Sequence, residues 1–222
     1  MKQIIDIVIF GILLILAACQ QEELTVKGTG TLLLEDLHVQ TPQHEMVETK
    51  AVDAELYVRI KNSSAVTQYE PGKVPTSLDL SAGIYQLEIF NEAYNTTSSN
   101  APIYYLSQSF TITAGAINRI EAIVPMTNVG IELVDNLPTS FTDYTLILNQ
   151  DNVQQQVGVG KTTYCKATLP ISYVLQGKNA DNEPFTSDEG RIDTPVAGTC
   201  YRIVYSLETK SWITETVGGK ES

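Results

Sequence analysis

The sequence is short of basic residues. It carries 14 Lys and Arg against 26 Asp and Glu, so its net charge is −12 and its pI is about 4.5. Protein–nucleic acid affinity comes largely from Lys and Arg contacts to phosphates, and docking on anionic lipid needs clusters of the same residues. The composition therefore disfavours nucleic acid and a broad electrostatic membrane dock as partners. It predicts an acidic exterior that promotes solubility.

Long apolar runs are equally scarce. Only residues 7–18 form one, and its length of about 12 residues falls short of the roughly 20 that a membrane-spanning helix needs. A positive Lys2, this short apolar core and the small residues Ala17 and Ala18 are typical of a secretory signal peptide. We therefore predict that residues 1–18 form a signal peptide and take no part in the fold.

Cysteine occurs only three times, at Cys19, Cys165 and Cys200. Export to an oxidising compartment permits a disulfide, and the two cysteines beyond the leader region are the even number that a bridge requires. Their spacing and the lack of a nearby histidine exclude a CxxC redox pair and a zinc site. The sequence leaves two alternatives open, a bridge between Cys165 and Cys200 or two buried thiols.

Histidine and the motifs of catalysis are nearly absent. His38 and His44 are the only histidines. Neither stands in a motif that supplies a nucleophile and an orienting acid. Acids are too numerous for one carboxylate pair to be singled out, and no regular spacing of oxygen ligands indicates a calcium site. We predict a non-enzymatic protein with no cofactor and no metal.

Helical periodicity is missing as well, and period-two alternation takes its place. Such runs, bounded by Gly, Asn, Pro and Ser, are typical of half-buried strands. They fall into two successive sets: residues 29–39, 57–61, 85–90, 109–113 and 117–123, then residues 129–134, 143–148, 171–175 and 200–205. Residues 40–50 and 177–190 are predicted to be long loops. The chain is therefore predicted to be all-β.

The two sets share landmarks in the same order. Three pairs recur at offsets of 83 to 88 residues: Tyr57 with Tyr144, Tyr85 with Tyr173, and Gly115 with Gly198. A near-constant offset indicates an internal repeat. Each half holds six to seven predicted strands in about 90–100 residues, the size of a Greek-key sandwich. We predict two tandem antiparallel β-sandwiches of the transthyretin or immunoglobulin type, at residues 28–126 and 127–222.

Residues Leu16-Ala17-Ala18-Cys19 resemble the lipobox of bacterial lipoproteins. The resemblance implies that Cys19 becomes the mature N-terminus and carries a thioether-linked diacylglycerol. Each buried CH₂ of its acyl chains would contribute about 0.8 kcal/mol to membrane anchoring. Residues 20–23, Gln-Gln-Glu-Glu, are similar to the acidic signals that direct Bacteroidota lipoproteins to the outer face of the outer membrane. The alternative interpretation of residues 20–23 is an acidic, solvated linker with no signal function. We expect residues 19–27 to form a lipidated linker and the protein to be displayed at the cell surface.

Four further motifs are similar to an uncharacterised family of Bacteroidota lipoproteins. Its members typically carry GTG-L-L after the lipid anchor, then L-x-x-G-x-Y, Ala-Pro-x-Tyr-Tyr and Phe-x-Ile-x-Ala-Gly. The segments that carry the likeness here are residues 28–37, 83–88, 101–105 and 110–115. The likeness covers residues 16–150 well and the remainder loosely. This likeness implies a cellular location and a fold but no activity. In its predicted organisation the chain is also similar to fimbrillin-type pilus subunits, which are lipidated pairs of β-sandwiches.

The fimbrillin likeness implies adhesion or fimbria-like surface assembly. In such an assembly a strand of one subunit completes a sheet of another through main-chain hydrogen bonds. Shaft subunits of that type are typically cut after an arginine early in the mature chain. The first arginine here is Arg59, inside a predicted strand. The resemblance therefore implies a base or anchor subunit that keeps its lipid, rather than a shaft subunit.

Tyrosines gather outside the alternating strands, with Tyr94, Tyr104 and Tyr105 in the predicted loop 91–106. Rings in a loop can form a ligand platform, because tyrosine offers a large apolar face with a polar tip. The favoured interpretation is that the loop covers a sheet edge with its tyrosines. The alternative is a glycan-binding surface lipoprotein, accessory to polysaccharide uptake, that uses these three tyrosines as its platform.

Overall fold

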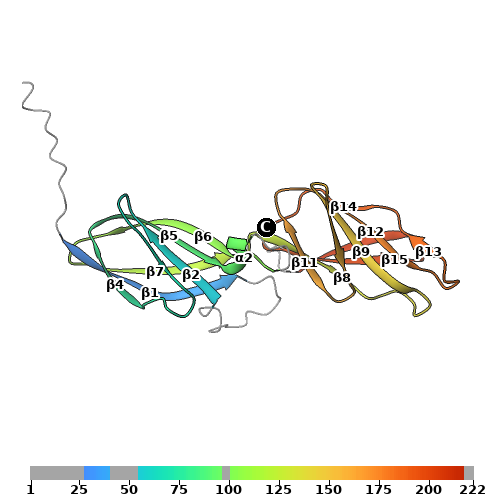
Figure 1. The fold of residues 1–222 in the computed structure, drawn as a ribbon, viewed down its shortest axis with the longest axis horizontal. Coiled ribbons are helices and arrows are strands. Elements are labelled where there is room, and N and C mark those ends of the chain that lie inside the picture. Colours follow the sequence, from blue (N-terminus) through green and yellow to red (C-terminus); the bar gives the residue numbers. More distant parts are fainter. Residues whose placement is uncertain (1–27, 41–54, 97–100, 218–222) are drawn as a thin grey trace, which may run out of the picture.

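The computed structural model describes residues 28–40, 55–96 and 101–217 of the 222-residue chain (Figure 1). The predicted signal peptide, Cys19 and the linker after it lie outside the described residues, as do His44 and nearly all of the predicted loop 40–50. These features stay predictions. Within the described ranges, no helix has the length and hydropathy that a bilayer crossing requires.

The first half of the chain forms a sandwich of two sheets. Its elements are β1 (Thr29–Gln40), β2 (Leu56–Lys61), β3 (Val66–Tyr69), β4 (Ser77–Ser81), β5 (Gly83–Asn91), α2 (Glu92–Thr96), β6 (Tyr105–Ile112) and β7 (Ile117–Pro125). One sheet has the strand order β4-β1-β7 and the other has the order β3-β2-β5-β6. A core of buried side chains lies between them, including Leu32, Val58, Leu87 and Val124.

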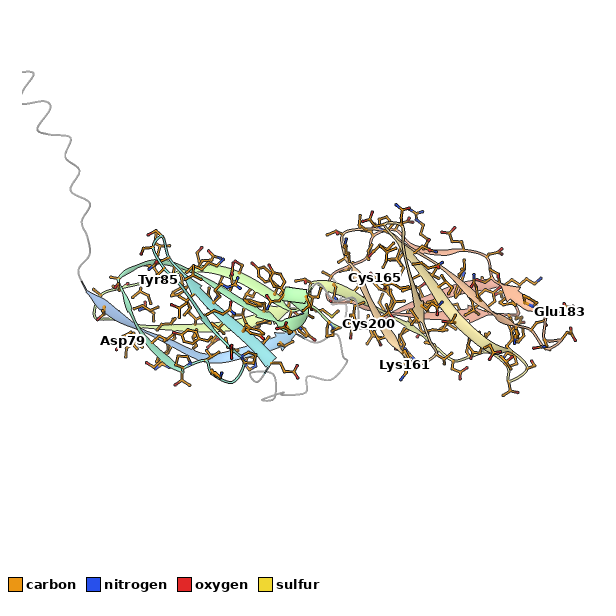
Figure 2. All side chains as sticks on the ribbon, in the orientation of Figure 1. Asp79, Tyr85, Lys161, Cys165, Glu183 and Cys200 are labelled. Atoms are coloured by element: carbon orange, nitrogen blue, oxygen red, sulfur yellow. The ribbon has the colours of Figure 1, made fainter. Side chains whose placement is uncertain are left out.

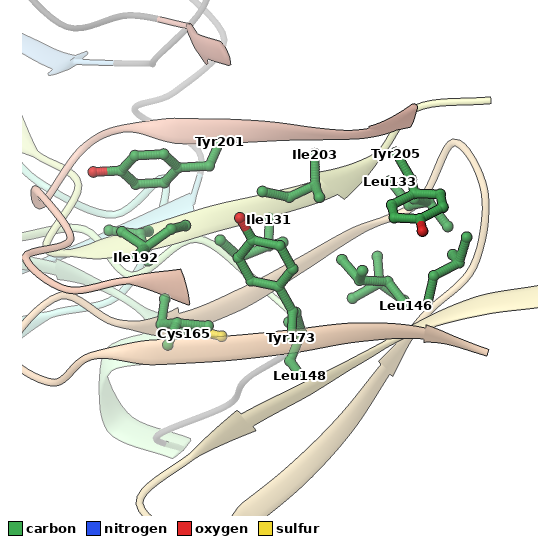
Figure 3. Close-up of a cluster of buried hydrophobic side chains, with 14 residues drawn as sticks. Ile131, Leu133, Leu146, Leu148, Cys165, Tyr173, Ile192, Tyr201, Ile203 and Tyr205 are labelled. Atoms are coloured by element: carbon green, nitrogen blue, oxygen red, sulfur yellow. The ribbon is translucent and has the colours of Figure 1, made fainter. Parts of the chain in front are cut away.

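The second half repeats this plan. Its strands are β8 (Asn128–Leu133), β9 (Thr142–Gln150), β10 (Val153–Val157), β11 (Thr162–Lys166), β12 (Ile171–Lys178), β13 (Pro184–Thr186), β14 (Gly190–Ile192), β15 (Cys200–Ser206) and β16 (Ser211–Val217). One sheet has the order β11-β8-β15-β16. The other has the order β10-β9-β12-β13, with β14 also paired to β12. Figure 3 shows the core of this sandwich, in which Ile131, Leu146, Tyr173 and Ile203 are buried.

The predicted tandem β-sandwich is confirmed, but each sandwich contains one parallel strand pair. β1 pairs antiparallel with β4 and parallel with β7, and β8 pairs antiparallel with β11 and parallel with β15. The chain reaches β7 from β6, which belongs to the opposite sheet. It therefore crosses between the layers and returns beside the first strand in the same direction. The wholly antiparallel arrangement expected from the sequence was wrong on this point.

The crossover turn is built identically in the two halves. Gly115 and Gly198 both have positive φ, 72° and 78°, a conformation that favours glycine. The Gly115 amide donates to the Thr29 carbonyl at 2.8 Å, and the Gly198 amide donates to the Asn128 carbonyl at 3.0 Å. The repeat predicted from the Ala-Gly pairs is therefore present at the level of single hydrogen bonds.

The tyrosine landmarks fit the repeat unequally. Tyr85 is the first buried residue of β5, and Tyr173 is the second buried residue of β12, two positions after Ile171. Ile60 pairs with Leu87 as Leu146 pairs with Leu175, which sets an offset of 86 (146 − 60) between β2 and β9. The sequence offset of 87 between Tyr57 and Tyr144 was therefore one residue too long. In β2 and β9 those two tyrosines lie on opposite faces of their sheets.

Short strands account for the main gaps in the prediction. Residues 177–190, expected to be a long loop, contain the end of β12, all of β13 and the start of β14. Strands of three residues are too short to display period-two alternation. The tip of this segment is a tight hairpin, in which the Asn179 amide donates to the Glu183 carbonyl at 2.9 Å.

The two sandwiches follow one another end to end (Figure 1). β7 ends at Pro125 and β8 begins at Asn128, and the two halves share no strand among the described residues. The boundary predicted between residues 126 and 127 falls in this short connection and stays a prediction. Because β1 runs parallel to β7, the chain enters the first sandwich at the end remote from the second. The β12–β13 hairpin, marked by Glu183 in Figure 2, lies at the opposite end of the molecule.

Candidate functional site

Two of the three predicted platform tyrosines come together on the outer face of the β3-β2-β5-β6 sheet. The rings of Tyr94 and Tyr105 stack with centroids 4.3 Å apart and planes 7° apart. Tyr94 also contacts Phe90, at 5.5 Å between centroids, and Phe90 stacks on Tyr57 at 5.4 Å. Phe90 is fully buried by its neighbours. We call these four side chains the aromatic cluster.

Strand register assembles the aromatic cluster. Tyr57 of β2 pairs with Phe90 of β5, and Phe90 pairs with Tyr105 of β6. Side chains of directly opposed residues lie on the same face of a sheet, so the three rings form a row across it. The short helix α2 begins immediately after β5 and brings Tyr94 over the same strands.

A charged network continues the outer face beside the aromatic cluster. Arg59 Nη1 donates to Glu88 Oε2 at 3.0 Å, and Lys61 pairs with the other oxygen of Glu88. Arg59 Nε and Nη2 both donate to Gln68 Oε1, at 3.0 and 2.8 Å. The guanidinium also lies over the Phe90 ring, 4.7 Å from its centroid, as a cation–π contact. The carboxylate of Glu88 is thus held by two cations.

The aromatic cluster and the charged network together cover the outer face of the β3-β2-β5-β6 sheet. The rings of Tyr94 and Tyr105 face one another, and the cations are engaged by Glu88 and Gln68. Desolvation raises the pKa of Tyr94, and a hydrogen bond to Glu92 raises the pKa of Tyr57, so both hydroxyls ionise at a higher pH than an ordinary tyrosine. The geometry supports the covering role expected for the loop. The glycan platform stays a prediction.

Tyr104 does not join the aromatic cluster. It precedes Tyr105 on an extended segment, so its side chain points to the opposite face and packs against the first core. Its backbone forms an isolated antiparallel bridge with Met126. Burial raises the pKa of Tyr104, with a smaller contribution from Tyr164 of the second sandwich. Tyr104 is therefore a residue of the junction between the sandwiches.

The bridge considered between Cys165 and Cys200 is not formed, and both cysteines are free thiols. Cys165 pairs with Val129, and Cys200 pairs with the next residue, Gly130. The two side chains therefore point to opposite faces of the sheet. β8 also lies between their strands, which places them about 9–10 Å apart, whereas a disulfide needs Cα atoms within about 7 Å.

The two thiols differ in their surroundings. Cys165 is buried in the second core among the side chains of Figure 3, and burial raises its pKa to about 11. Cys200 is half-buried on the outer face near the junction, where desolvation and then the Glu132 carboxylate raise its pKa. Thiolate is the reactive form of cysteine, so neither group is activated. The alternative of two unbridged thiols is the one observed.

No catalytic constellation forms around the histidine that the structure describes. His38 is exposed on β1, opposite Ile123 of β7. In the part of the chain that the structure describes, no group of three His, Cys, Asp or Glu side chains could hold a metal ion.

A cleft of about 220 Å³ opens between the sheets of the first sandwich, where β3 and β4 form neighbouring edges. Asp79 and Tyr85, labelled in Figure 2, both line it. Their polar atoms are engaged within the protein. Asp79 Oδ1 accepts from the Thr31 hydroxyl at 2.8 Å, and the Tyr85 hydroxyl donates to the Ser81 carbonyl at 2.9 Å. The cleft therefore offers few polar groups to a ligand.

A free strand edge distinguishes the first sandwich from the second. β15, the counterpart of β7, pairs with β8 on one side and with β16 on the other. β7 pairs with β1 alone among the strands of the described residues. No described strand of the first sandwich thus fills the place that β16 takes in the second. Two large apolar side chains mark the outer face of β7, Ile117 at 66% exposure and Ile123 at 62%.

Strand alternation determines which backbone amides of β7 face this free edge. The Thr31 amide donates to the Ala116 carbonyl at 2.9 Å, so residue 116 and every second residue after it face β1. The amides of Ile117, Glu121 and Ile123 therefore face the free edge. The β1–β7 register shifts between Leu34 and Asp36, where β1 has one extra residue. The burial of β7 itself alternates along its length, so the pattern holds in β7.

The pattern of the sequence did not predict this edge. One feature of the sequence bears on this edge. The second half continues past β15 into β16, whereas the first half has no corresponding strand after β7 among the described residues. A strand left without a neighbour cannot be identified before the strand order is known.

Two of the solved structures that are similar to this chain are fimbrial proteins. The tip fimbrial protein Mfa3 from Porphyromonas gingivalis, with a C-terminal truncation, matches with a TM-score of 0.50 at 6% identity, covering 86% of this chain and 100% of that one. A fimbrilin from Porphyromonas gingivalis W83 matches with a TM-score of 0.46 at 11% identity, covering 82% and 90%. At such low identity the first match shows a shared fold.

The sequence itself matches none of the curated proteins. One family model matches residues 28–219, a range that includes both sandwiches and every described residue. The chain therefore belongs to the family described as a domain of unknown function, DUF4493.

Proposed function

We propose that this chain is a non-enzymatic surface lipoprotein of the outer membrane that acts in adhesion or fimbria-like assembly. The observation that carries the proposal is the free edge of β7, at the place where the second sandwich has β16. A free edge is a template on which another chain can add a strand through main-chain hydrogen bonds. The shared fold with a tip fimbrial protein is consistent with this role.

The direction of the chain supports an anchor at the first sandwich. β1 enters at the end remote from the second sandwich, so a lipid on Cys19 would hold that end at the membrane. The second sandwich and its β12–β13 hairpin would then project outward. Acyl chains of one such lipid anchor a soluble rod without a membrane-spanning helix.

A base or anchor role fits the position of the first arginine. Arg59 lies within β2 and binds Glu88 and Gln68. A protease that cuts after arginine needs an extended, accessible segment, which a paired central strand does not offer. The chain would keep its lipid and receive a partner, rather than join a shaft.

Two experiments test the address and the partner separately. Mass spectrometry of the mature N-terminus should show a diacylated Cys19, and protease added to intact cells should digest both sandwiches. An unmodified Cys19, or protection from protease in intact cells, would contradict the proposed address.

The partner test uses cross-linking in living cells through a photo-reactive residue at Ile117, which lies on β7 itself and is 66% exposed. Glu121→Pro removes an edge amide without touching the β1 side of β7, because proline lacks the N–H. We expect it to reduce the cross-linked partner at least tenfold. Glu121→Ala keeps the amide and is the matched control. Equal recovery of the partner by both variants would rule out strand addition at this edge.

A further inference from the structure

The connection between the sandwiches is very short and is buried. Only Met126 and Thr127 separate β7 from β8, and Met126 is 2% exposed. Linked domains ordinarily move relative to one another unless their interface is extensive. The contacts around these two residues decide whether this connection acts as a hinge.

The second sandwich reaches back to the first through Asn128. This buried residue begins β8. Its side chain forms hydrogen bonds with the segment Ala101–Tyr104, which precedes β6 in the first sandwich. Asn128 Nδ2 donates to the Ala101 carbonyl at 3.0 Å, and Asn128 Oδ1 accepts from the Ile103 amide at 2.9 Å. Thr127 adds a bond from its amide to the Ile103 carbonyl at 2.8 Å.

The first sandwich holds the same segment from its other side through Asn91. Asn91 Nδ2 donates to the Pro102 carbonyl at 2.7 Å, and Asn91 Oδ1 accepts from the Tyr104 amide at 3.1 Å. The Asn91 amide donates to the Tyr104 carbonyl at 3.3 Å. Two asparagine side chains, one from each sandwich, thus form hydrogen bonds with the backbone of one four-residue segment. Pro102 suits the middle of it, since proline brings no further amide that would need a partner.

The second sandwich also closes on the connection from behind. The Gly198 amide donates to the Asn128 carbonyl at 3.0 Å. A Cβ at Gly198 would lie 3.4 Å from the Met126 carbonyl oxygen, so the turn before β15 packs directly on the connection. Tyr104 pairs with Met126 from the opposite side. The connection is therefore enclosed by both sandwiches.

We infer that the segment Ala101–Tyr104, clamped between Asn91 and Asn128, locks the two sandwiches into one rigid body. The Ala-Pro-x-Tyr-Tyr motif then has a mechanical role. Its first four residues form the lock, and its last tyrosine enters the aromatic cluster. A rigid rod transmits a load applied at the far sandwich to the anchored end and keeps the β7 edge at a fixed orientation. This inference does not depend on the identity of any partner and holds even if the proposed function fails.

Residual dipolar couplings of the full chain in detergent test the lock. Couplings from both sandwiches of the native protein should fit one alignment tensor. The amides of residues 101–104 and 126–128 should have order parameters near 0.85, the value of rigid backbone. Two different tensors, or order parameters below about 0.6 at the junction, would overturn the inference.

Asn128→Ala provides the matched perturbation. It removes both side-chain bonds to Ala101 and Ile103, and we expect the two sandwiches to acquire separate alignment tensors. Asn118→Ala is the control, because Asn118 bridges the Thr31 and Ala116 carbonyls within one sandwich, at 3.4 Å each. The control should keep a single tensor. If Asn128→Ala also kept one tensor, the lock would not reside in this residue. Should the variant misfold, the native couplings alone still decide the question.

Discussion

The two sandwiches of this chain are built on one strand plan and differ at one edge. β4-β1-β7 and β3-β2-β5-β6 correspond to β11-β8-β15 and β10-β9-β12-β13, with the same directions of pairing. The second sandwich adds β16 beside β15, whereas β7 has no second neighbour among the strands that the structure describes. Natural sheets usually cover or shorten their edges. A duplicated fold that covers one copy of an edge and leaves the other open therefore points to use of the open copy.

The outer faces differ as well. Arg59 and Glu88 are paired across β2 and β5, whereas the equivalent pair across β9 and β12 is Thr145 and Gln176. At this pair of positions the first sandwich carries charges and the second carries neutral polar groups, while an ion pair between Lys178 and Asp143, at 3.0 Å, lies elsewhere on β9 and β12. We expect stability of the first sandwich to respond to charge changes, and stability of the second to respond to its core and its buried thiol.

The core tyrosines give the largest expected difference. Tyr173 is 1% exposed and meets Trp212 edge-on at 4.9 Å, whereas Tyr85 is 6% exposed and borders the open cleft. Tyr173→Ala should lower the free energy of unfolding of its sandwich by about 3–5 kcal/mol, and Tyr85→Ala by about 2–4 kcal/mol.

Fluorescence of Trp212, the only tryptophan, reports the second sandwich in urea titrations, and amide exchange in β5 reports the first. Tyr173→Phe is the control. It loses only the hydroxyl contact to Thr214 at 3.1 Å and should cost about 0.5–1.5 kcal/mol. A larger loss for Tyr85→Ala than for Tyr173→Ala would invert the comparison of the two cores.

Alkaline pH should weaken the second sandwich through Cys165. Burial raises the pKa of this thiol from 9.0 to about 11, so the unfolded chain releases the proton at lower pH than the folded chain. The stabilising difference is present below pH 9 and is lost as pH rises towards 11, by about 2–3 kcal/mol. Cys165→Ala should flatten the pH dependence of the Trp212 transition over this range. An unchanged slope in that variant would contradict the burial of the thiol.

Charge on the outer face should produce a smaller effect, confined to the first sandwich. Glu88→Gln removes the carboxylate shared by Arg59 and Lys61. Both cations are about one third exposed, so we expect a loss of only about 0.5–1.5 kcal/mol, and less in high salt. Gln176→Ala, at the equivalent place in β12, should change stability by less than about 0.5 kcal/mol. Equal effects at both sites would show that the faces do not differ energetically.

Alternation in the sequence predicted much of the fold because most long strands bury one face. β2, β7, β12 and β15 follow the expected period, whereas residues 87–90 of β5 are buried on both faces. Strands of three residues, such as β13 and β14, were missed because they are shorter than the pattern that identifies a strand. The tyrosine offset between β2 and β9 was wrong by one residue, since pattern alignment tolerates a one-residue slip that reverses the face of every side chain.

The candidate site was harder to predict, because it depends on strand order. Tyr104 and Tyr105 were grouped by proximity in the sequence, yet adjacent residues of an extended segment face opposite ways. Cys165 and Cys200 proved to lie on opposite faces, with β8 between their strands. The free edge of β7 becomes visible only when the two sandwiches are compared strand by strand.

Hydrogen exchange at three pairs of equivalent amides tests the open edge most directly. The amides of Ile117, Glu121 and Ile123 face the free edge of β7, and those of Cys200, Val204 and Ser206 face β16. In the isolated protein we predict that the β7 amides exchange rapidly, while their β15 counterparts are protected at least a hundredfold. Strong protection of the β7 amides equal to that of β15 would show that the edge is already covered and would contradict the account.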